Sequence, residues 1–181
     1  MRIIDTQRLH LRPLGEADEP LYCRIYTDPE LMRHVGAPLT LTAAQRSFGV
    51  ACRQAMWPTN RPWWVMSERD SHTDIGVLGL VRHGAAAQIG ILMFAQWQGR
   101  GFATEVITVL ADLAFRDPGL AMLGLDHAPG NGAMLGLMEK LEFLRDGPVQ
   151  DDVRVRWQLA RHRWQAHRSN PCDLASGGAG G

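Results

Sequence analysis

The feature that most restricts the fold of this 181-residue chain is the segment from residue 89 to residue 115. It joins an apolar run, IGILMF, to the loop AQWQGRG and then to a helical pattern, FATEVITVLADLAF. Glycine loses more conformational entropy on folding than any other residue, so two glycines at the start of a helix indicate a close approach to the backbone. The segment therefore predicts a strand, a ligand-binding loop and an amphipathic helix in succession. The apolar stripe of this helix is Ala103, Val106, Ile107, Leu110, Ala111 and Ala114.

Three phosphate-binding patterns compete for Gly99 and Gly101. The dinucleotide fingerprint GxGxxG lacks its third glycine here, because the sequence reads GRGFAT, and the GK[ST] of a P-loop is absent. The third pattern is QxxGxG at Gln96–Gly101, in which loop and helix N–H groups converge and the helix dipole favours an anion such as pyrophosphate. A strand-to-helix turn without a ligand is the alternative that this short motif leaves open.

Composition excludes several classes of function. Hydrophobic residues make up 45% of the chain and charged residues 21%, which is typical of a globular protein, and the length predicts one domain. Lys+Arg and Asp+Glu number 19 each, so no basic excess indicates nucleic acid or a membrane surface. We expect no signal peptide, membrane span or metal cluster, and the three separated cysteines favour a reduced, cytoplasmic setting.

The remaining periodicity predicts a mixed α/β sheet with helices on both faces. Strands are expected at 8–12, 63–68, 75–81, 87–94, 120–128 and 153–160, and helices within 16–26, from Thr40 or Thr42 to about 57, and at 131–143. The single domain is predicted to span residues 1–165. Residues 166–181 form a Gly-rich C-terminal tail that cannot order itself by burying apolar surface.

Five stretches together resemble the GCN5-related N-acetyltransferases, and within them the RimJ/RimL-like group. They are TQRLHLRPL at 6–14, DIGVLGLV at 74–81, the strand and loop at 87–107, APGNGAMLGLMEKLEF at 128–143 and VRVRWQLARHRW at 153–164. The resemblance covers about residues 3 to 164. It implies a mostly antiparallel sheet with a splayed strand, and an enzyme in which an amine attacks acetyl-CoA directly in a ternary complex.

The resemblance also implies which residues bind acetyl-CoA. Ile91, Leu92 and Met93 would offer backbone groups to the pantetheine arm, and an N–H near Leu92 or Met93 would stabilise the oxyanion. Asn131 would face the pantetheine side. The pyrophosphate would be held by Gln98, Gly99, Arg100, Gly101, Phe102 and Ala103.

The chain departs from the family pattern at several places. Met134 stands where relatives carry a small hydroxyl residue, and Glu142 stands where they carry glycine before Phe143. The only tyrosines, Tyr22 and Tyr26, lie in the first predicted helix, away from the family's usual tyrosine acid. These departures keep a second function open, a catalytically weak coenzyme A-binding sensor or interaction domain. The predicted acceptor is a protein N-terminus or a small-molecule amine, and the predicted assembly is a monomer or homodimer.

The catalytic and acceptor-binding residues are predicted from their positions. His127 ends an apolar strand row with Leu123 and Leu125, which makes it the candidate general base; the alternative is a half-buried histidine bound to a backbone carbonyl. His34, His72 and His83 lie in loops and are weaker candidates, and Asp126 and Glu68 are weaker alternatives. Trp63 and Trp64, in the stretch MWPTNRPWWVM at 56–66, are predicted to line the acceptor site; the alternative is an aromatic cover over the core.

Overall fold

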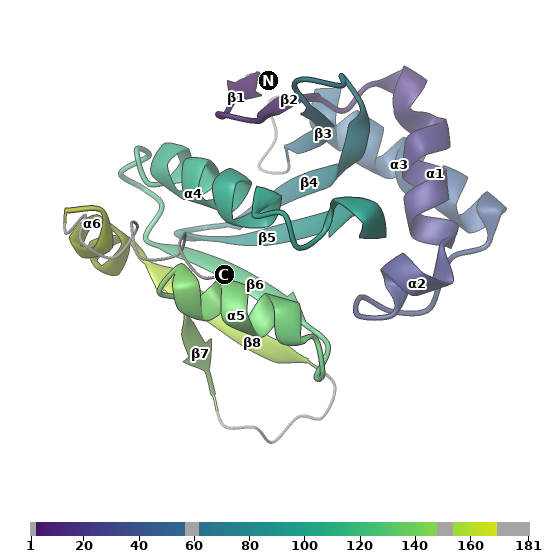
Figure 1. Cartoon of the computed structure of the whole chain (residues 1–181). Helices are drawn as coiled ribbons and strands as arrows, with labels where there is room; N and C mark the ends of the chain where they lie inside the picture. The colour runs from purple at the N-terminus through teal and green to yellow at the C-terminus, as the bar shows by residue number, and fades with distance from the viewer. Residues whose placement is uncertain (1–2, 57–61, 148–153, 170–181) are drawn as a thin grey trace, which may run out of the picture.

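A single sheet of eight strands organises the molecule, which Figure 1 presents as a computed structural model describing residues 3–56, 62–147 and 154–169. The strand order is β1-β2-β3-β4-β5-β6-β8-β7, and every neighbouring pair is antiparallel except β5 and β6. The strands are β1 (Ile4–Asp5), β2 (Leu9–Pro13), β3 (Trp63–Glu68), β4 (Asp74–His83), β5 (Ala86–Met93), β6 (Met122–His127), β7 (Leu144–Asp146) and β8 (Val155–Ala160).

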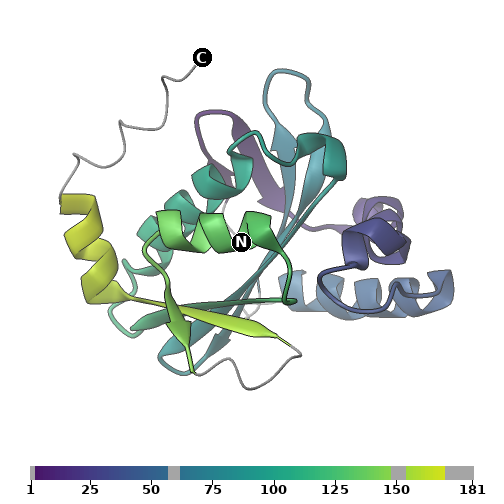
Figure 2. The ribbon, with the colours of Figure 1, turned by 60° about the horizontal axis from the view of Figure 1, so that its bottom comes forward.

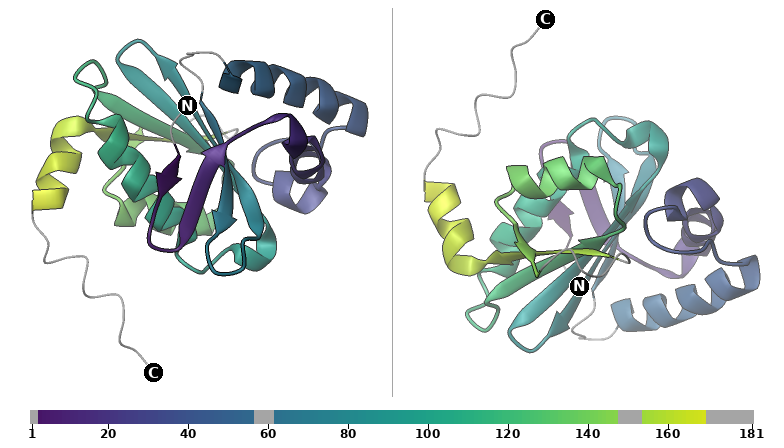
Figure 3. Two further views of the ribbon diagram at one scale, coloured as in Figure 1. Left: turned by 90° about the horizontal axis from the view of Figure 1, so that it is seen from above. Right: turned by 90° about the horizontal axis from the view of Figure 1, so that it is seen from below.

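Helices cover both faces of this sheet, as the sequence predicts. Helices α1 (Glu19–Thr27), α2 (Pro29–Met32) and α3 (Leu41–Met56) lie on one face. Helices α4 (Phe102–Ala114), α5 (Gly132–Lys140) and α6 (Arg161–Ser169) lie on the other, as Figure 3 shows from two sides. Two short 3-10 turns, η1 (Glu16–Asp18) and η2 (Ala95–Trp97), precede α1 and α4. Among the described helices, none is both long and apolar enough to cross a bilayer.

The parallel pair β5 and β6 separates along its length. Its register runs from Ala86 opposite Met122 to Ile89 opposite Leu125 and goes no further. Strand β5 stays paired with β4 up to Met93, whereas β6 stays paired with β8 up to His127. The sheet is therefore splayed beyond Ile89, which confirms the predicted splayed strand.

The predicted apolar faces form the core. On α4, Val106, Ile107, Leu110 and Ala111 are buried against the sheet and Ala114 is partly buried beside them, which confirms five of the six stripe residues; Ala103 lines the cavity described below. On the opposite face, a smaller cluster packs α1 and α3 against β3. It contains Leu14, Tyr22, Phe48, Ala51, Cys52 and Val65. Thr40 caps α3, because its hydroxyl oxygen accepts a hydrogen bond from the Ala43 N–H at 3.3 Å.

The structure contains elements that the periodicity did not predict. The short β1, α2 and β7 are too brief for a periodic signal. Helix α6 runs to Ser169, four residues beyond the predicted domain end at 165, and Figure 2 shows it following directly on β8. Trp164 attaches α6 to α4, because its indole N–H donates to the Asp112 carboxylate at 2.9 Å. Residues 170–181 of the predicted tail lie outside the described residues.

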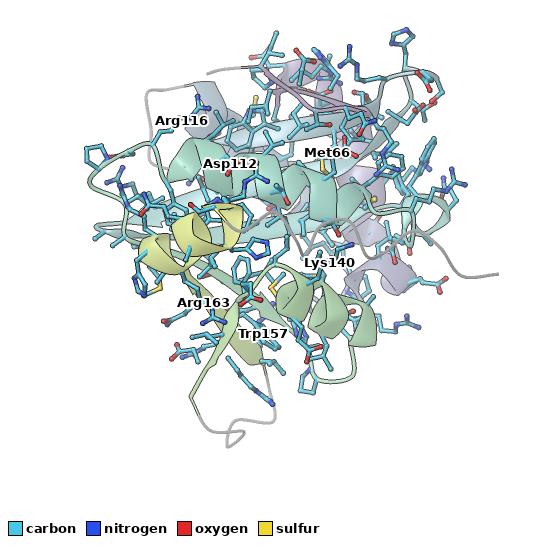
Figure 4. The ribbon with its side chains drawn as sticks, turned by 60° about the vertical axis from the view of Figure 1, so that its left-hand side comes forward. Met66, Asp112, Arg116, Lys140, Trp157 and Arg163 are labelled. Atoms are coloured by element: carbon cyan, nitrogen blue, oxygen red, sulfur yellow. The ribbon has the colours of Figure 1, made fainter. Side chains whose placement is uncertain are left out.

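Glu142 replaces the family's glycine without loss of the turn that follows α5. Its φ of 62° lies in the left-handed region, at the position that normally takes glycine after a helix. The Phe143 N–H donates to the Met138 carbonyl at 2.9 Å and the Glu142 N–H donates to Glu139 at 3.1 Å, which is the Schellman pattern. Arg163 of α6 stabilises this glutamate by donating to its carbonyl and its carboxylate, and Figure 4 shows Arg163 beside the end of α5.

Candidate functional site

A cavity of about 890 Å³ passes through the splay of the sheet. One end lies at the loop before α4 and the first turns of α5. The other end lies among α1, α2, Trp63 of β3 and Arg154 before β8. We call these the loop end and the helix end of the cavity. The predicted residues at its loop end are Gln98, Gly99, Gly101, Phe102, Ala103 and Asn131.

The loop before α4 has the backbone geometry that requires its two glycines. Gly99 has a φ of 73° and Gly101, the N-cap of α4, has a φ of 80°; side chains rarely adopt either value. A Cβ placed on Gly99 would meet nothing within 4 Å, so the space there is open. The Gln98 side-chain amide donates to the Met93 carbonyl at 2.8 Å, which ties the loop to the end of β5.

The end of β5 directs backbone groups into the splay. The Phe94 N–H donates to the Ile75 carbonyl of β4 at 3.0 Å, so Phe94 directs its backbone groups toward β4. Leu80 of β4 is paired with Ile89, but its N–H donates to the Pro62 carbonyl and so points away from β5. Because the direction alternates along an antiparallel strand, Ile91 and Met93 point their N–H and C=O groups toward the side that β6 has left. Gln98 occupies the Met93 carbonyl, so the Ile91 N–H and C=O and the Met93 N–H are the groups offered to a ligand.

Helix α5 lines the cavity with small residues. Asn131 caps it, since its side-chain oxygen accepts from the Met134 N–H at 3.2 Å, and its amide hydrogens remain as donors. Gly132, Ala133 and Gly136 also line the cavity and are exposed, so a chain-like ligand can lie against this part of the helix. Lys140 lies at the end of α5, and Figure 4 shows it on the side turned toward α4.

The structure brings nine of the ten predicted coenzyme A residues to one cavity. Arg100 is the exception, because it does not line the cavity and its guanidinium lies 5.0 Å from the centre of the Trp97 ring. Whether the other nine bind the cofactor stays a prediction. They are Ile91, Leu92, Met93, Gln98, Gly99, Gly101, Phe102, Ala103 and Asn131.

His127 lies in the cavity wall, but its ring nitrogens are engaged in hydrogen bonds. The Trp157 indole N–H donates to Nε2 at 2.9 Å, and an indole can only donate. Nδ1 therefore carries the proton and donates to the Ala128 carbonyl at 2.8 Å. The side chain is 5% exposed. This arrangement leaves no lone pair for an incoming proton, so the geometry favours the alternative of a hydrogen-bonded buried histidine, and the role of His127 as a general base stays a prediction.

The two predicted tryptophans lie on opposite faces of β3, as successive strand residues must. Trp63 is half-buried, lines the helix end of the cavity and makes an edge contact with Tyr22 at 6.1 Å between ring centres. Trp64 is 5% exposed and lies in the large core cluster on the α4 side, away from the cavity lining. This position favours the alternative of core packing for Trp64, and a role in acceptor binding stays a prediction without support from the cavity lining. The other residues of that stretch, 57–61, lie outside the described residues.

The helix end contains side chains that the sequence reading did not assign to a site. Asp28, in the "DP" turn, caps α2 by accepting from the N–H groups of Glu30 and Leu31. This turn and the end of α1 line the cavity through Tyr26, Glu30, Arg33, His34 and Val35. His34 was a weak candidate in the sequence; its Nε2 accepts from the Arg33 guanidinium at 3.2 Å. Burial raises the pKa of Tyr26 far above its ordinary value, so this hydroxyl stays protonated.

The cavity carries a mixed charge on its described residues. Its basic side chains are Arg33, Lys140 and Arg154, and its carboxylates are Glu30 and Asp126. Arg154 is held by the Val35 carbonyl at 2.9 Å and the Asp126 carbonyl at 3.2 Å. Among the described residues, no group of three or more His, Cys, Asp or Glu side chains is arranged to hold a metal ion.

Comparison with known proteins places this geometry in context. Residues 8–144 match the family model described as an acetyltransferase (GNAT) domain. An uncharacterised N-acetyltransferase p20 from Bacillus licheniformis is 23% identical over 163 residues, covering 88% of this chain and 92% of that protein.

Solved structures share the fold. Spermidine N-acetyltransferase from Vibrio cholerae, in complex with coenzyme A and spermine, aligns with a TM-score of 0.74 at 18% identity, over 87% of this chain and 98% of that one. RimL, a ribosomal L7/L12 α-N-protein acetyltransferase in complex with coenzyme A, aligns with a TM-score of 0.73 at 14% identity, over 88% of this chain and 98% of that one.

Proposed function

Because this chain belongs to the GNAT family of acetyl-CoA-dependent acetyltransferases, we propose that it moves the acetyl group of acetyl-CoA to the primary amine of a protein N-terminus or a small molecule. Support comes from one observation above all, the splayed β5 with free backbone groups that leads directly to the glycine loop before α4. A bound acetyl-CoA would place its reacting carbon in the splay, midway between the two ends of the cavity.

The loop end suits the phosphate-bearing part of the cofactor. N–H groups of the loop and the first turn of α4 lie at the positive end of the helix dipole, equivalent to roughly half a charge. The pantetheine arm would then pair with Ile91 as an added strand and pass Asn131 and the small residues of α5.

The proposed acetyl transfer depends on how the amine and the thioester are positioned in the splay. The neutral amine attacks the thioester carbonyl, a C–N bond forms, and the negative charge develops on the carbonyl oxygen. The Met93 N–H points into the splay and would stabilise that oxygen, whereas the Leu92 N–H is directed at β4. The C–S bond breaks as the carbonyl re-forms. The nitrogen, which carries a positive charge after the attack, loses its extra proton through water to the departing thiolate, and coenzyme A leaves as a thiol with a pKa of about 8.5. Orientation of the two reactants alone supplies about 7–11 kcal/mol of the barrier.

The amine must lose a proton before it attacks. We do not assign this step to His127, whose two ring nitrogens are hydrogen-bonded. Glu30 and Asp126 are the carboxylates of the cavity lining among the described residues, and they would attract an ammonium group to the helix end. We propose that the attracted ammonium passes its proton to water in the cavity. Trp63 would pack against the apolar part of the acceptor.

Three further inferences accompany this function. We propose that residues 1–165, extended by the rest of α6 to Ser169, act as one catalytic domain in the cytoplasm. The proposed partners are acetyl-CoA and an amine acceptor, without nucleic acid or membrane. The proposed assembly is a monomer or a homodimer.

The experiment that tests the function measures release of the coenzyme A thiol. The purified chain is mixed with acetyl-CoA and, in separate reactions, spermidine, an aminoglycoside, free amino-acid derivatives and short peptides with different N-terminal residues. We expect amine-dependent thiol release well above the rate without acceptor for one of these classes. Tight acetyl-CoA binding in calorimetry, with no release for any amine, would instead support the coenzyme A-binding sensor.

A further inference from the structure

The N-terminal hairpin is bound to the first turn of α4. Both oxygens of the Glu105 carboxylate accept hydrogen bonds from the segment that joins β1 and β2. One oxygen accepts from the Thr6 hydroxyl at 2.6 Å and from the Arg8 N–H at 2.7 Å, and the other accepts from Arg8 Nε at 2.7 Å. Thr6 and Arg8 are the first two landmarks of the TxRLxLRPL stretch, for which the proposed function provides no role so far.

Arg8 also contacts three successive residues of the glycine loop. Its guanidinium donates to the Arg100 carbonyl at 2.9 Å and lies 4.5 Å from the centre of the Phe102 ring. A Cβ on Gly101 would lie 3.4 Å from the same guanidinium, so the arginine packs closely over this glycine. One side chain thus holds residues 100–102, on either side of the N-cap of α4.

The same contacts balance a charge near the predicted anion site. Burial by itself would raise the pKa of Glu105, but hydrogen bonds from Thr6 and Arg8 outweigh burial and lower the pKa below its ordinary value. Glu105 is therefore ionised at neutral pH. A carboxylate in the first turn would repel a pyrophosphate at that helix end, and Arg8, in a salt bridge with Glu105, cancels its charge.

We propose that Arg8, oriented by Thr6 and Glu105, is a positioning residue for the pyrophosphate of acetyl-CoA. It fixes the backbone of residues 100–102 so that their N–H groups converge, and it neutralises Glu105. Arg8 does not itself line the cavity, so it acts through the loop. This inference rests on the proposed function, because it concerns the cofactor site of that function.

The test uses the full chain and compares four variants with the unaltered protein: Arg8→Ala, Arg8→Lys, the double variant Arg8→Ala/Glu105→Gln, and Arg82→Ala. The last is a matched control at the opposite end of α4, where Arg82 forms a salt bridge with Asp117. Calorimetry gives the Kd of acetyl-CoA, steady-state kinetics give KM for both substrates, and thermal unfolding gives Tm.

We expect Arg8→Ala to raise the Kd and KM of acetyl-CoA about tenfold, with kcat and acceptor KM changed less than about twofold. Arg8→Lys keeps a cation beside Glu105 but cannot reach Arg100 and Phe102 together, so its Kd should lie between those of Arg8→Ala and the unaltered chain. The double variant should bind acetyl-CoA more tightly than Arg8→Ala alone, because Glu105→Gln removes the unbalanced charge. Arg82→Ala should lower Tm and leave Kd unchanged.

Three outcomes would overturn the proposal. The first is a folded Arg8→Ala that binds acetyl-CoA as the unaltered chain does. The second is a double variant that binds no more tightly than Arg8→Ala, which a merely structural salt bridge predicts. The third is an equal rise of Kd in Arg82→Ala. Should Arg8→Ala fail to fold, Arg8→Gln compared with Arg8→Gln/Glu105→Gln gives the same comparison, because glutamine also leaves the charge of Glu105 unbalanced. Failure of the unaltered chain to bind acetyl-CoA would overturn the proposed function itself.

Discussion

The two ends of the cavity are built from different parts of the chain. The loop end and the splayed strand that leads to it are mostly backbone: the N–H and C=O groups of Ile91 and the N–H of Met93, beyond the pairing with β6, and two glycines with positive φ. The helix end is mostly side chains, including Trp63 and Glu30, contributed by separate elements. A backbone site keeps its shape when the surrounding sequence changes, whereas a side-chain site changes with each substitution. We infer that the first end suits a constant ligand and the second a variable one.

Charge divides the two ends in the same way. At the loop end the favourable field comes from the helix dipole, and the charge of Glu105 in the first turn of α4 is matched by Arg8. At the helix end, Glu30 and Asp126 share the wall with Arg33 and Arg154. A polycation would meet as many basic as acidic side chains there. Under the proposed function, we infer that this balance favours an acceptor with a single ammonium group over one with several.

The largest expected effect tests the backbone character of the loop end. Gly99→Val and Gly101→Val each place a β-branched residue at a positive φ, so the loop must leave the geometry in which its N–H groups converge. We expect acetyl-CoA affinity in calorimetry to fall by at least about 100-fold, because close backbone approach is lost. Gly84→Val is the matched control, since Gly84 has a φ of 61° and open space in the turn between β4 and β5.

The control separates loss of the site from loss of stability. All three variants incur a similar backbone strain, and only two of them lie at the cavity. If Gly99→Val and Gly101→Val bind acetyl-CoA as Gly84→Val does while all remain folded, the glycine loop is not the cofactor site.

The second prediction compares the two neighbouring tryptophans of β3. Trp64→Ala removes a side chain from the large core, and we expect it to lower the free energy of unfolding by about 3–5 kcal/mol. Trp63→Ala removes a wall of the helix end, and we expect it to raise acceptor KM about tenfold with little change in acetyl-CoA KM. The opposite pattern, a stable Trp64→Ala with raised acceptor KM, would return Trp64 to the acceptor site.

The loop end is built mostly from backbone and the helix end mostly from side chains, and this difference decides how much of each end the sequence can predict. The glycine pair, the apolar strand before it and the helical stripe after it predict the loop end, because each is a local pattern with its own physical cause. Trp63 and Trp64 have the same chemistry and adjacent positions, and only the direction of β3 in the folded sheet decides which one reaches the cavity.

The helix end depends on tertiary contacts that no local pattern contains. Arg154 is 28 residues from Asp126 in the chain and is bound to its carbonyl in the structure. His127 also depends on a tertiary contact that no local pattern contains. Its place at the end of an apolar strand was predictable, but the hydrogen bond from Trp157, 30 residues away, was not. That contact favours a buried structural role for His127 over the predicted role of a base.

The third prediction concerns His127, which lies between the two ends of the cavity. His127→Ala leaves the Trp157 indole N–H without its partner, so we expect the free energy of unfolding to fall by about 1–3 kcal/mol. We expect kcat to change less than about threefold, with the pH dependence of the rate unaltered, because general-base catalysis typically contributes about 10²–10⁴-fold. Chemical denaturation and a pH–rate profile measure the two effects.

A paired variant identifies the cause of that destabilisation. His127→Phe/Trp157→Phe removes both hydrogen-bonding groups, and we expect it to be more stable than His127→Phe alone, since no buried donor is then left unpaired. A loss of kcat above about 100-fold, together with loss of the limb near neutral pH, would restore His127 as the general base.

The smallest expected effect tests whether the helix end attracts the acceptor by charge. Glu30 is exposed, so its attraction for an ammonium group is weakened by water and by salt. We expect Glu30→Gln to raise acceptor KM about threefold at low ionic strength and less at high ionic strength, with acetyl-CoA KM unchanged.

Glu139→Gln is the matched control, because Glu139 is an exposed glutamate of α5 outside the cavity lining. Equal effects of the two substitutions would mean that the acceptor responds to the overall charge of the molecule, and a change confined to acetyl-CoA KM would place Glu30 at the cofactor. An effect confined to Glu30 and to acceptor KM would show that side chains of the helix end, unlike the backbone of the loop end, select the second substrate.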